Sequence, residues 1–206
     1  MYKNAFKFAD RVGLDKLDLI PSLRLFFYRA RYPSLITHLS VTMIETQVEI
    51  AAPPSKVREV LLDSSRYPEW HTSLIHRLEA KDSTKTLATL IPGDVIRCDI
   101  DGMKFDAEIT ENSENLFQWQ GPPVAGLIAG LHSFYMLSTK DGSATILKQT
   151  EEFTGVLAFL MGPSLLGRKL VGQYRRFNAD LKRRVEELKL KDRSARRAWN
   201  AWTATS

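Results

Sequence analysis

The residues of this chain best suited to moving protons lie in its C-terminal half. His132 begins the segment HSFYMLS and Glu151 lies in the segment ATILKQTEEF, both of which alternate like β-strands. Histidine changes charge near neutral pH, so on a strand that faces a cavity His132 would move a proton or hydrogen-bond a ligand carbonyl. The alternative for His132 is a core histidine bonded to a neighbouring strand or loop.

Glu151 shares one strand face with Gln149 and Phe153. The pattern leaves open whether this face or the opposite one, with Lys148 and Glu152, points inward. If Glu151 points inward it needs a partner, because an unpaired buried carboxylate is costly. Glu151 would then be the best acid or base of the interior, and a solvated or salt-bridged glutamate is the alternative.

Other kinds of catalytic site are not indicated. The four histidines include no His-x-x-x-His pair, and Cys98 has no partner at zinc spacing, so neither a metal nor another cofactor is expected. His71, beside Trp70, is interpreted as a surface turn residue, with a role at the cavity mouth as the alternative. The segment GPSLLG lacks the Gly-x-Ser-x-Gly spacing of a nucleophile turn, and its Ser164 is predicted to cap a helix.

The segments that position these residues are mainly strand-like. Residues 42–50 alternate cleanly, and two prolines then lead into a short amphipathic helix, SKVREVLLD, and a Tyr-Pro-Glu-Trp turn. Six further strand-like segments follow between residues 75 and 153, separated by turn signals such as Asp101-Gly102. These features predict about seven antiparallel strands in meander order, with one face in water.

The last predicted element is a long amphipathic helix. From Leu166 onward, apolar or aromatic residues recur at steps of three or four as far as residue 188. About 25 helical residues would span about 37 Å, and a helix about 10 Å wide cannot fill a curved sheet wrapped around it. The sequence therefore predicts a hollow between sheet and helix. The pattern is lost after residue 190, so residues 191–206 are expected to be a basic, disordered tail.

The net charge of +5 belongs to the two ends of the chain. Residues 182–206 carry 8 Lys or Arg against 3 Asp or Glu, whereas residues 43–181 carry 14 against 18. A nucleic-acid-binding protein more often places positive charge on its folded surface, so no nucleic-acid partner is expected. Residues 1–41 form a basic and apolar extension that suggests two short helices, each ended by a proline. This extension either packs on the domain or acts as a membrane-surface or targeting element.

The order of these elements, with three motifs, resembles the START-like helix-grip superfamily (SRPBCC), in particular its polyketide cyclase/dehydrase and lipid-transport branch. The motifs are VEIAAPPSKVREVLLDSSRYPEWHTSL, FQWQGPPVAGLIAGLHSFYML and TEEFTGVLAFLMG. The resemblance lies within a domain predicted at residues 42–190. It implies an α+β helix-grip fold, a curved antiparallel sheet of about seven strands wrapped on the C-terminal helix, with two short helices after the first strand. It does not specify function, because this fold carries many functions.

Three functions are then open. The preferred one is non-catalytic binding or transport of a hydrophobic small molecule, such as a lipid, sterol, quinone or aromatic compound, between sheet and helix. The second is a polyketide cyclase or aromatase that uses His132, Glu151 or Tyr135 as acid or base. The third is a protein tethered to an anionic membrane surface by its basic ends. The residues expected to line the cavity are Tyr67, Trp70, Phe105, Trp119, His132, Phe134, Gln149, Phe153, Tyr174 and Phe177.

Two further features bear on location and access. A single cysteine and the lack of an unbroken apolar leader favour a cytoplasmic protein, with a mitochondrial one as the alternative. The loop PPVAGLIAG is apolar for a surface connection, so it is either a lid over the cavity mouth or a simple packed loop. Trp199 and Trp202 follow basic residues, and their preferred interpretation is a flexible tail, with insertion into a membrane interface as the alternative.

Overall fold

The computed structural model describes residues 40–139 and 141–204, and within these ranges seven strands form one sheet. The expectations for residues 1–39 lie outside the described residues. The strands are β1 (Ser40–Ile50), β2 (Ile75–Ala80), β3 (Val95–Ile100), β4 (Met103–Asn112), β5 (Leu116–Gln120), β6 (Ala129–Ser138) and β7 (Thr145–Gly155). The helices are α3 (Pro54–Leu62) and α4 (Gly167–Thr203). Short 3₁₀ turns occupy Ser64–Glu69, Leu87–Thr89 and Ala158–Met161.

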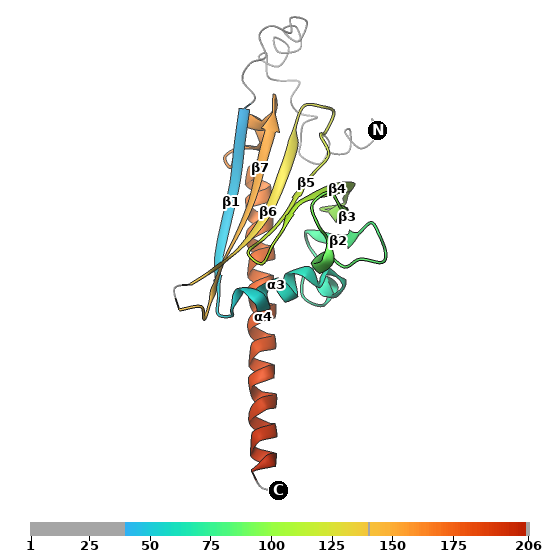
Figure 1. Ribbon diagram of the computed structural model, residues 1–206. Coiled ribbons are helices and arrows are strands. Elements are labelled where there is room, and N and C mark those ends of the chain that lie inside the picture. The colour runs from blue at the N-terminus through green and yellow to red at the C-terminus, as the bar shows by residue number, and fades with distance from the viewer. Residues whose placement is uncertain (1–39, 140, 205–206) are drawn as a thin grey trace, which may run out of the picture.

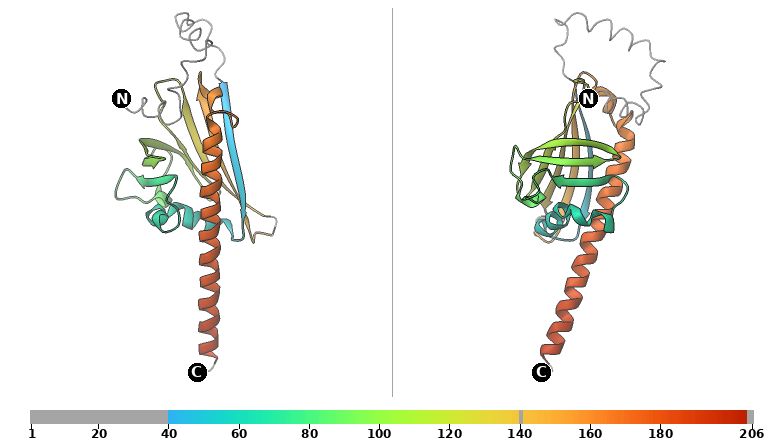
Figure 2. Two further views of the ribbon diagram at one scale, coloured as in Figure 1. Left: turned by 180° about the vertical axis from the view of Figure 1, so that it is seen from behind. Right: turned by 90° about the vertical axis from the view of Figure 1, so that its right-hand side faces the viewer.

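The sheet is antiparallel throughout and has the order β1-β7-β6-β5-β4-β3-β2. Strands β2 to β7 therefore form the predicted meander, and β1 pairs with β7 at one edge of the sheet. The sheet curves around α4, which crosses one of its faces (Figures 1 and 2). The α+β helix-grip fold predicted from the sequence is confirmed, including the short helix and the 3₁₀ turn that follow the first strand.

The inner face of the sheet and the first half of α4 share one apolar core. The predicted helical stripe is buried in this half at Tyr174, Phe177, Leu181 and Val185. Strand β1 contributes Ile44 and Ile50 from the face that alternation assigns to the interior. Removing this apolar surface from water is the main force that holds the helix in the sheet.

Helix α4 does not begin as the sequence predicts. Its first residue is Gly167, Leu166 precedes it as N-cap, and no side chain caps the helix, so the cap predicted at Ser164 is wrong. A Cβ at Gly167 would overlap the Met161 carbonyl oxygen and crowd Ile44. The helix therefore begins where a residue without a side chain lets it approach the 3₁₀ turn and β1 closely.

The C-terminal end of α4 also differs from expectation. Residues 191–203 continue the helix without interruption, so the disordered tail predicted after residue 190 is a wrong prediction for this segment. The segment contains neither proline nor glycine and is rich in alanine and arginine, which are good helix formers. Extending an existing helix adds one hydrogen bond per residue without a new nucleus, so it needs no packing partner. No helix among the described residues is long and apolar enough to cross a membrane.

Candidate functional site

Four polar side chains meet on the inner face of the sheet, and we call them the polar cluster: His132, Gln149, Glu151 and Tyr174. His132 on β6 and Glu151 on β7 are direct register partners, so their side chains leave the same face of adjacent strands. His132 Nδ1 contacts Glu151 Oε2, and the Tyr174 hydroxyl on α4 donates to the same oxygen at 3.0 Å. Glu151 thus points inward and has the partners that a carboxylate there requires.

The hydrogen bonds of His132 determine which of its nitrogens carries the proton. Gln149 Nε2 lies 3.2 Å from His132 Nε2, and an amide nitrogen can only donate. His132 Nε2 is therefore the acceptor, and in the neutral ring the proton is on Nδ1, from which it is donated to Glu151. Gln149 is fully buried, and its Oε1 has no hydrogen-bond partner among the described residues.

Tyr174 keeps its proton in this environment. Burial raises the pKa of the Tyr174 hydroxyl well above its usual value, and the nearby Glu151 carboxylate raises it further. At neutral pH the hydroxyl is therefore a permanent donor. It is aimed at the carboxylate from the helix side, opposite the strand that carries His132.

Gly130 makes room for this arrangement. A Cβ at position 130 would overlap Glu151 Oε1 and touch the Phe153 ring. The residue lies two positions before His132 on the same strand face. In the sequence the Gly-x-His spacing is the signal that marks this position.

Aromatic rings surround the polar cluster. Trp119 stacks on His132 with ring centroids 4.3 Å apart, and Phe134 contacts the same imidazole edge to face at 4.9 Å. Phe134 also packs against Phe177 of α4. The predicted lining residues Trp119, Phe134 and Phe177 are therefore brought together in the interior, where they pack against one another.

The Tyr-Pro-Glu-Trp turn closes another part of the interior. Tyr67 and Trp70 are buried, and their rings lie 5.8 and 5.6 Å from the Phe177 ring. The Tyr67 hydroxyl donates to the carbonyl of Leu61 at 2.6 Å, which fastens the turn to α3. Both residues thus bound the interior beside α4 through packing.

Three other predicted residues occupy different positions. Phe153 is buried next to Gly130, its register partner, and Phe105 is half-buried at the edge of the core. Tyr135 lies on the outer face of β6, because it is three residues from His132 and successive side chains alternate. Tyr135 therefore does not join His132 and Glu151, and Tyr174 takes the position of the nearby hydroxyl.

His71 does not lie where the turn pattern predicts. It is buried, not on the surface, and its Nδ1 lies 2.9 Å from Asp180 Oδ2 on α4. Its Nε2 accepts the backbone N–H groups of Leu74 and Ile75 at 3.0 and 3.4 Å. Burial lowers the pKa of His71, and Asp180 opposes this in part. Since Asp180 is 109 positions away, no local pattern could have revealed the pair.

The apolar loop between β5 and β6 is anchored at one end of the sheet. Val124 pairs with Ile128, and the N–H of Leu157 donates to the carbonyl of Leu127 at 3.2 Å. Gly155 has a φ of 117°, and a Cβ there would overlap the Leu127 carbonyl. The loop thus packs on the segment that leads from β7 to α4, close in sequence to Gly130 and His132.

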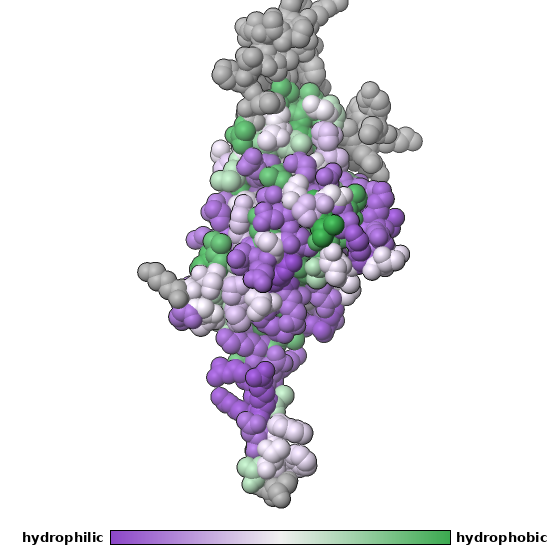
Figure 3. Space-filling model, viewed as in Figure 1, coloured by the Kyte–Doolittle hydropathy of each residue, from purple (hydrophilic) through white to green (hydrophobic). Residues whose placement is uncertain are grey.

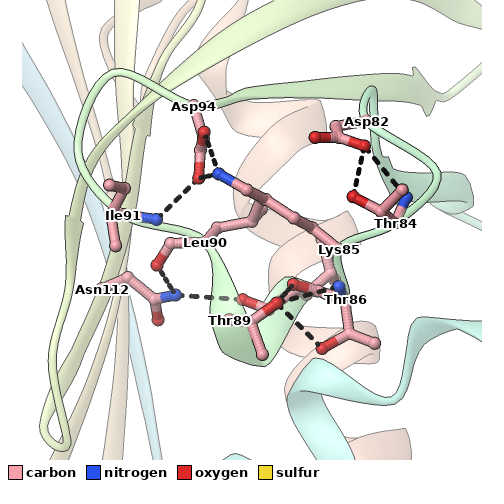
Figure 4. Close-up of polar contacts among 10 residues, drawn as sticks. Asp82, Thr84, Lys85, Thr86, Thr89, Leu90, Ile91, Asp94 and Asn112 are labelled. Carbon is pink, nitrogen blue, oxygen red and sulfur yellow. Dashed lines mark hydrogen bonds and ion pairs between the residues drawn. The ribbon is translucent and has the colours of Figure 1, made fainter.

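An open surface depression of about 360 Å³ lies elsewhere, beside the loop between β2 and β3. Polar groups of this loop are bonded to neighbouring residues (Figure 4): Asp94, which lines the depression, accepts from Lys85 Nζ with both oxygens at 2.7 and 2.8 Å. Asn112 donates to the carbonyls of Leu87 and Leu90 at 3.0 and 2.7 Å. The polar groups of this loop are therefore used to hold the loop in its conformation. For this reason we place the candidate site at the polar cluster and not at the depression. The described residues contain no group of three or more His, Cys, Asp or Glu that could hold a metal ion.

Solved structures of similar fold include both enzymes and other proteins. Norcoclaurine synthase from Thalictrum flavum, in complex with dopamine and hydroxybenzaldehyde, has a TM-score of 0.53 at 12% identity over 72% of this chain and 88% of its own. The Zhui aromatase/cyclase of a Streptomyces species has a TM-score of 0.53 at 17% identity over 71% and 94%. A START superfamily protein from Mycobacterium smegmatis has a TM-score of 0.50 at 19% identity over 71% and 98%. At these identities the likeness concerns the fold.

The sequence matches no curated protein. Residues 42–186, however, match the family described as polyketide cyclase / dehydrase and lipid transport. The match includes all seven strands except the first two residues of β1, and it includes α4 as far as Glu186. By its sequence and its helix-grip fold, the chain belongs to the polyketide cyclase / dehydrase and lipid transport family.

Proposed function

We propose that the protein binds a hydrophobic small molecule that carries a hydroxyl group, between the sheet and α4, without converting it chemically. The observation that carries this proposal is Gln149 Oε1, which is buried and has no hydrogen-bond partner among the described residues. Buried amide oxygens usually have a partner. Those of Gln173 and Asn178 also have none among the described residues, but of the three only Gln149 belongs to the polar cluster. An O–H donor on a ligand would supply one, and fatty alcohols, sterols, quinols and phenols have such a group.

The surroundings of Gln149 support an apolar ligand body. The polar cluster lies among Trp119, Phe134 and Phe177. A ligand that replaced some of the contacts between these rings would gain about 25 cal/mol of binding free energy for each Å² of its apolar surface that leaves water. The family to which the chain belongs includes lipid transport in its description. The fold relative norcoclaurine synthase was solved with dopamine and hydroxybenzaldehyde, which are small hydroxylated aromatic molecules.

The first test is to extract whatever the protein carries when it is purified from its own host, with native mass spectrometry before extraction. We expect one class of hydroxylated lipid or aromatic compound in near-stoichiometric amount. Thermal unfolding with paired probes then tests the role of the hydroxyl, because a ligand that binds only the folded state raises Tm. 2-Naphthol and dodecanol should stabilise the protein more than naphthalene and dodecane.

The variant Gln149→Leu removes the unpartnered acceptor, and with it the Nε2 donor to His132, and keeps a similar side-chain volume. Losing one neutral hydrogen bond should weaken binding of the hydroxylated probes about fivefold. The matched control is Gln118→Leu on the outer face, where Gln118 bonds Thr110 and Ser133, and this variant should retain the preference for hydroxylated probes. An empty protein that neither probe pair stabilises would refute the binding function.

A second function is favoured by one specific contact set: an acid–base enzyme of the cyclase type. Glu151 is held between the imidazole of His132 and the hydroxyl of Tyr174, so its carboxylate is positioned to take up a proton from a bound substrate. Glu151→Gln keeps the shape and removes the base. If the protein is such an enzyme, this variant binds an aromatic polyketide-like substrate normally and loses its turnover by at least a hundredfold, which is typical of a missing general base. Equal product formation by both proteins excludes that role.

A further inference from the structure

The last part of α4 leaves the domain and extends away from it (Figures 1 and 2). Every residue from Leu190 to Thr203 is exposed, whereas Leu181 and Val185 are buried. At 1.5 Å per residue this exposed segment is about 20 Å long. In the space-filling view the projecting part is strongly hydrophilic near the domain and paler toward its end (Figure 3).

One face of this segment is apolar. Ala195, Ala198, Trp199 and Trp202 follow the spacing i, i+3, i+4 and i+7 that places residues on one side of a helix. The two tryptophan rings pack together with centroids 5.4 Å apart, and their side chains are 63% and 62% exposed. Two large rings held in water on a rigid helix are a costly surface feature unless something covers them.

The opposite face is basic. Lys189, Arg193, Arg196 and Arg197 follow the spacing i, i+4, i+7 and i+8, and at 100° per residue their mean direction is roughly 150° from that of the apolar stripe. Between positions 189 and 203 the single acidic residue is Asp192. The segment is thus amphipathic, with four of its five cations on one side and tryptophan on the other, whereas Lys191 lies on the apolar side about one turn before Ala195.

We propose that residues 189–203 of α4 bind the surface of an anionic lipid membrane. Tryptophan favours the boundary between lipid head groups and acyl chains, and basic residues beside it are attracted to negatively charged lipids. An amphipathic helix with arginine on its polar face and tryptophan on the other lies in the plane of such an interface. A coiled coil with a second copy fits less well, because two of the four stripe residues are alanines and coiled-coil seams use large aliphatic residues.

The test measures binding of the full-length protein to vesicles of phosphatidylcholine with and without about one third phosphatidylserine. We expect binding to the anionic vesicles alone, and weaker binding at 0.5 M salt, because the Debye length falls from about 10 Å at 0.1 M toward about 3 Å at 1 M. Tryptophan fluorescence should shift to the blue on binding. Trp70 and Trp119 are buried, so this shift reports Trp199 and Trp202 and should disappear in a double Trp→Ala variant of the exposed pair.

Arginine variants distinguish membrane binding by residues 189–203 from attraction by the positive charge of the whole helix. Replacing Arg193, Arg196 and Arg197 by Gln should weaken binding about fivefold for each residue, hence on the order of a hundredfold together. The matched control replaces the exposed Arg168, Arg175 and Arg176, which lie on the same helix beside the domain, and should weaken it much less. Equal losses in both triple variants, equal binding to neutral vesicles, or self-association through the tail without vesicle binding would each overturn the proposal.

Discussion

At the scale of single residues, the polar cluster depends on a position that has no side chain. Gly130 lies against the Glu151 carboxylate, and the hydrogen bonds from His132 and Tyr174 depend on where that carboxylate sits. The glycine is thus as much a part of the site as the groups that could do chemistry. Its role follows from close approach, because any Cβ would occupy the space of the Glu151 oxygen.

Gly130→Ala should destabilise the protein by about 1–3 kcal/mol, because the displaced carboxylate leaves buried hydrogen-bonding groups unsatisfied. Urea unfolding measures the change. The control is Gly172→Ala in α4, whose Cβ would meet no atom within 4 Å, so it should stabilise the helix by about 0.5–1 kcal/mol. If Glu151 carries the cost, Gly130→Ala adds little in a Glu151→Ala background, and an unchanged cost there would contradict this account.

His71 makes a second prediction at the residue scale, on pH. Its folded pKa lies below the ordinary value of about 6.5, so below that pH the unfolded chain binds more protons than the folded one. Stability from this group is therefore complete above about pH 6.5 and is lost as pH falls below it, by at most about 1.4 kcal/mol per pH unit. Burial of the imidazole is the main cause of the lowered pKa. In addition, Nε2 accepts the backbone N–H groups of Leu74 and Ile75 and cannot do so once protonated.

The charged groups near His71 are Asp180, its partner, His76, and Arg183, which bonds Asp180. His71→Gln should flatten the dependence of the urea midpoint on pH between 5 and 7, because glutamine does not titrate. His76→Gln, at an exposed neighbouring position, should leave that slope nearly unchanged. A slope that survives in His71→Gln would assign the dependence to another group.

At the scale of elements, α4 is one continuous helix whose two parts have different surroundings. Its first half is held by the sheet, and its last turns continue only because the helix is already formed. The same substitution should therefore have very different effects along it. Leu181→Ala should cost about 2–5 kcal/mol, as buried leucines do, whereas Leu190→Ala at a 62% exposed position should stay within about 0.5 kcal/mol. Comparable costs in urea unfolding would mean that the projecting segment is packed in solution.

The same element explains what the sequence could and could not predict. Strand alternation and the three-four spacing predict the sheet, the long helix and the inward placement of Trp119, Phe134 and Phe177, because these patterns arise from burial itself. The inner face of β7 was left open, because Glu151 alternates with Glu152 and only the pairing with His132 and Tyr174 decides between them. The helical end of α4 does not follow from the pattern at 170–188, because that stripe arises from packing against the sheet and residues 190–203 are exposed.

At the scale of the whole molecule, the two proposals assign different tasks to the two parts of the chain. The domain would hold the ligand in its interior, and the end of α4 would hold the domain at the membrane from which a lipophilic ligand comes. Charge supports this division, since residues 43–181 carry 14 basic against 18 acidic residues and residues 182–206 carry 8 against 3. An acidic domain is repelled by an anionic surface, so the basic end would decide how the molecule approaches it.

Deleting residues 192–206 should therefore change the rate at which the protein takes up a ligand from vesicles, but not its affinity for that ligand in solution. The deletion leaves the interior intact, so the dissociation constant for a hydroxylated probe in solution should not change. Transfer of that probe from anionic vesicles to the protein should slow, because tethering raises the local concentration of the protein at the surface. The difference in transfer rate between the full-length and the shortened protein should vanish in 0.5 M salt and with neutral vesicles. A changed solution affinity would mean that the tail belongs to the binding site, and equal transfer rates under all conditions would mean that it has no part in delivery.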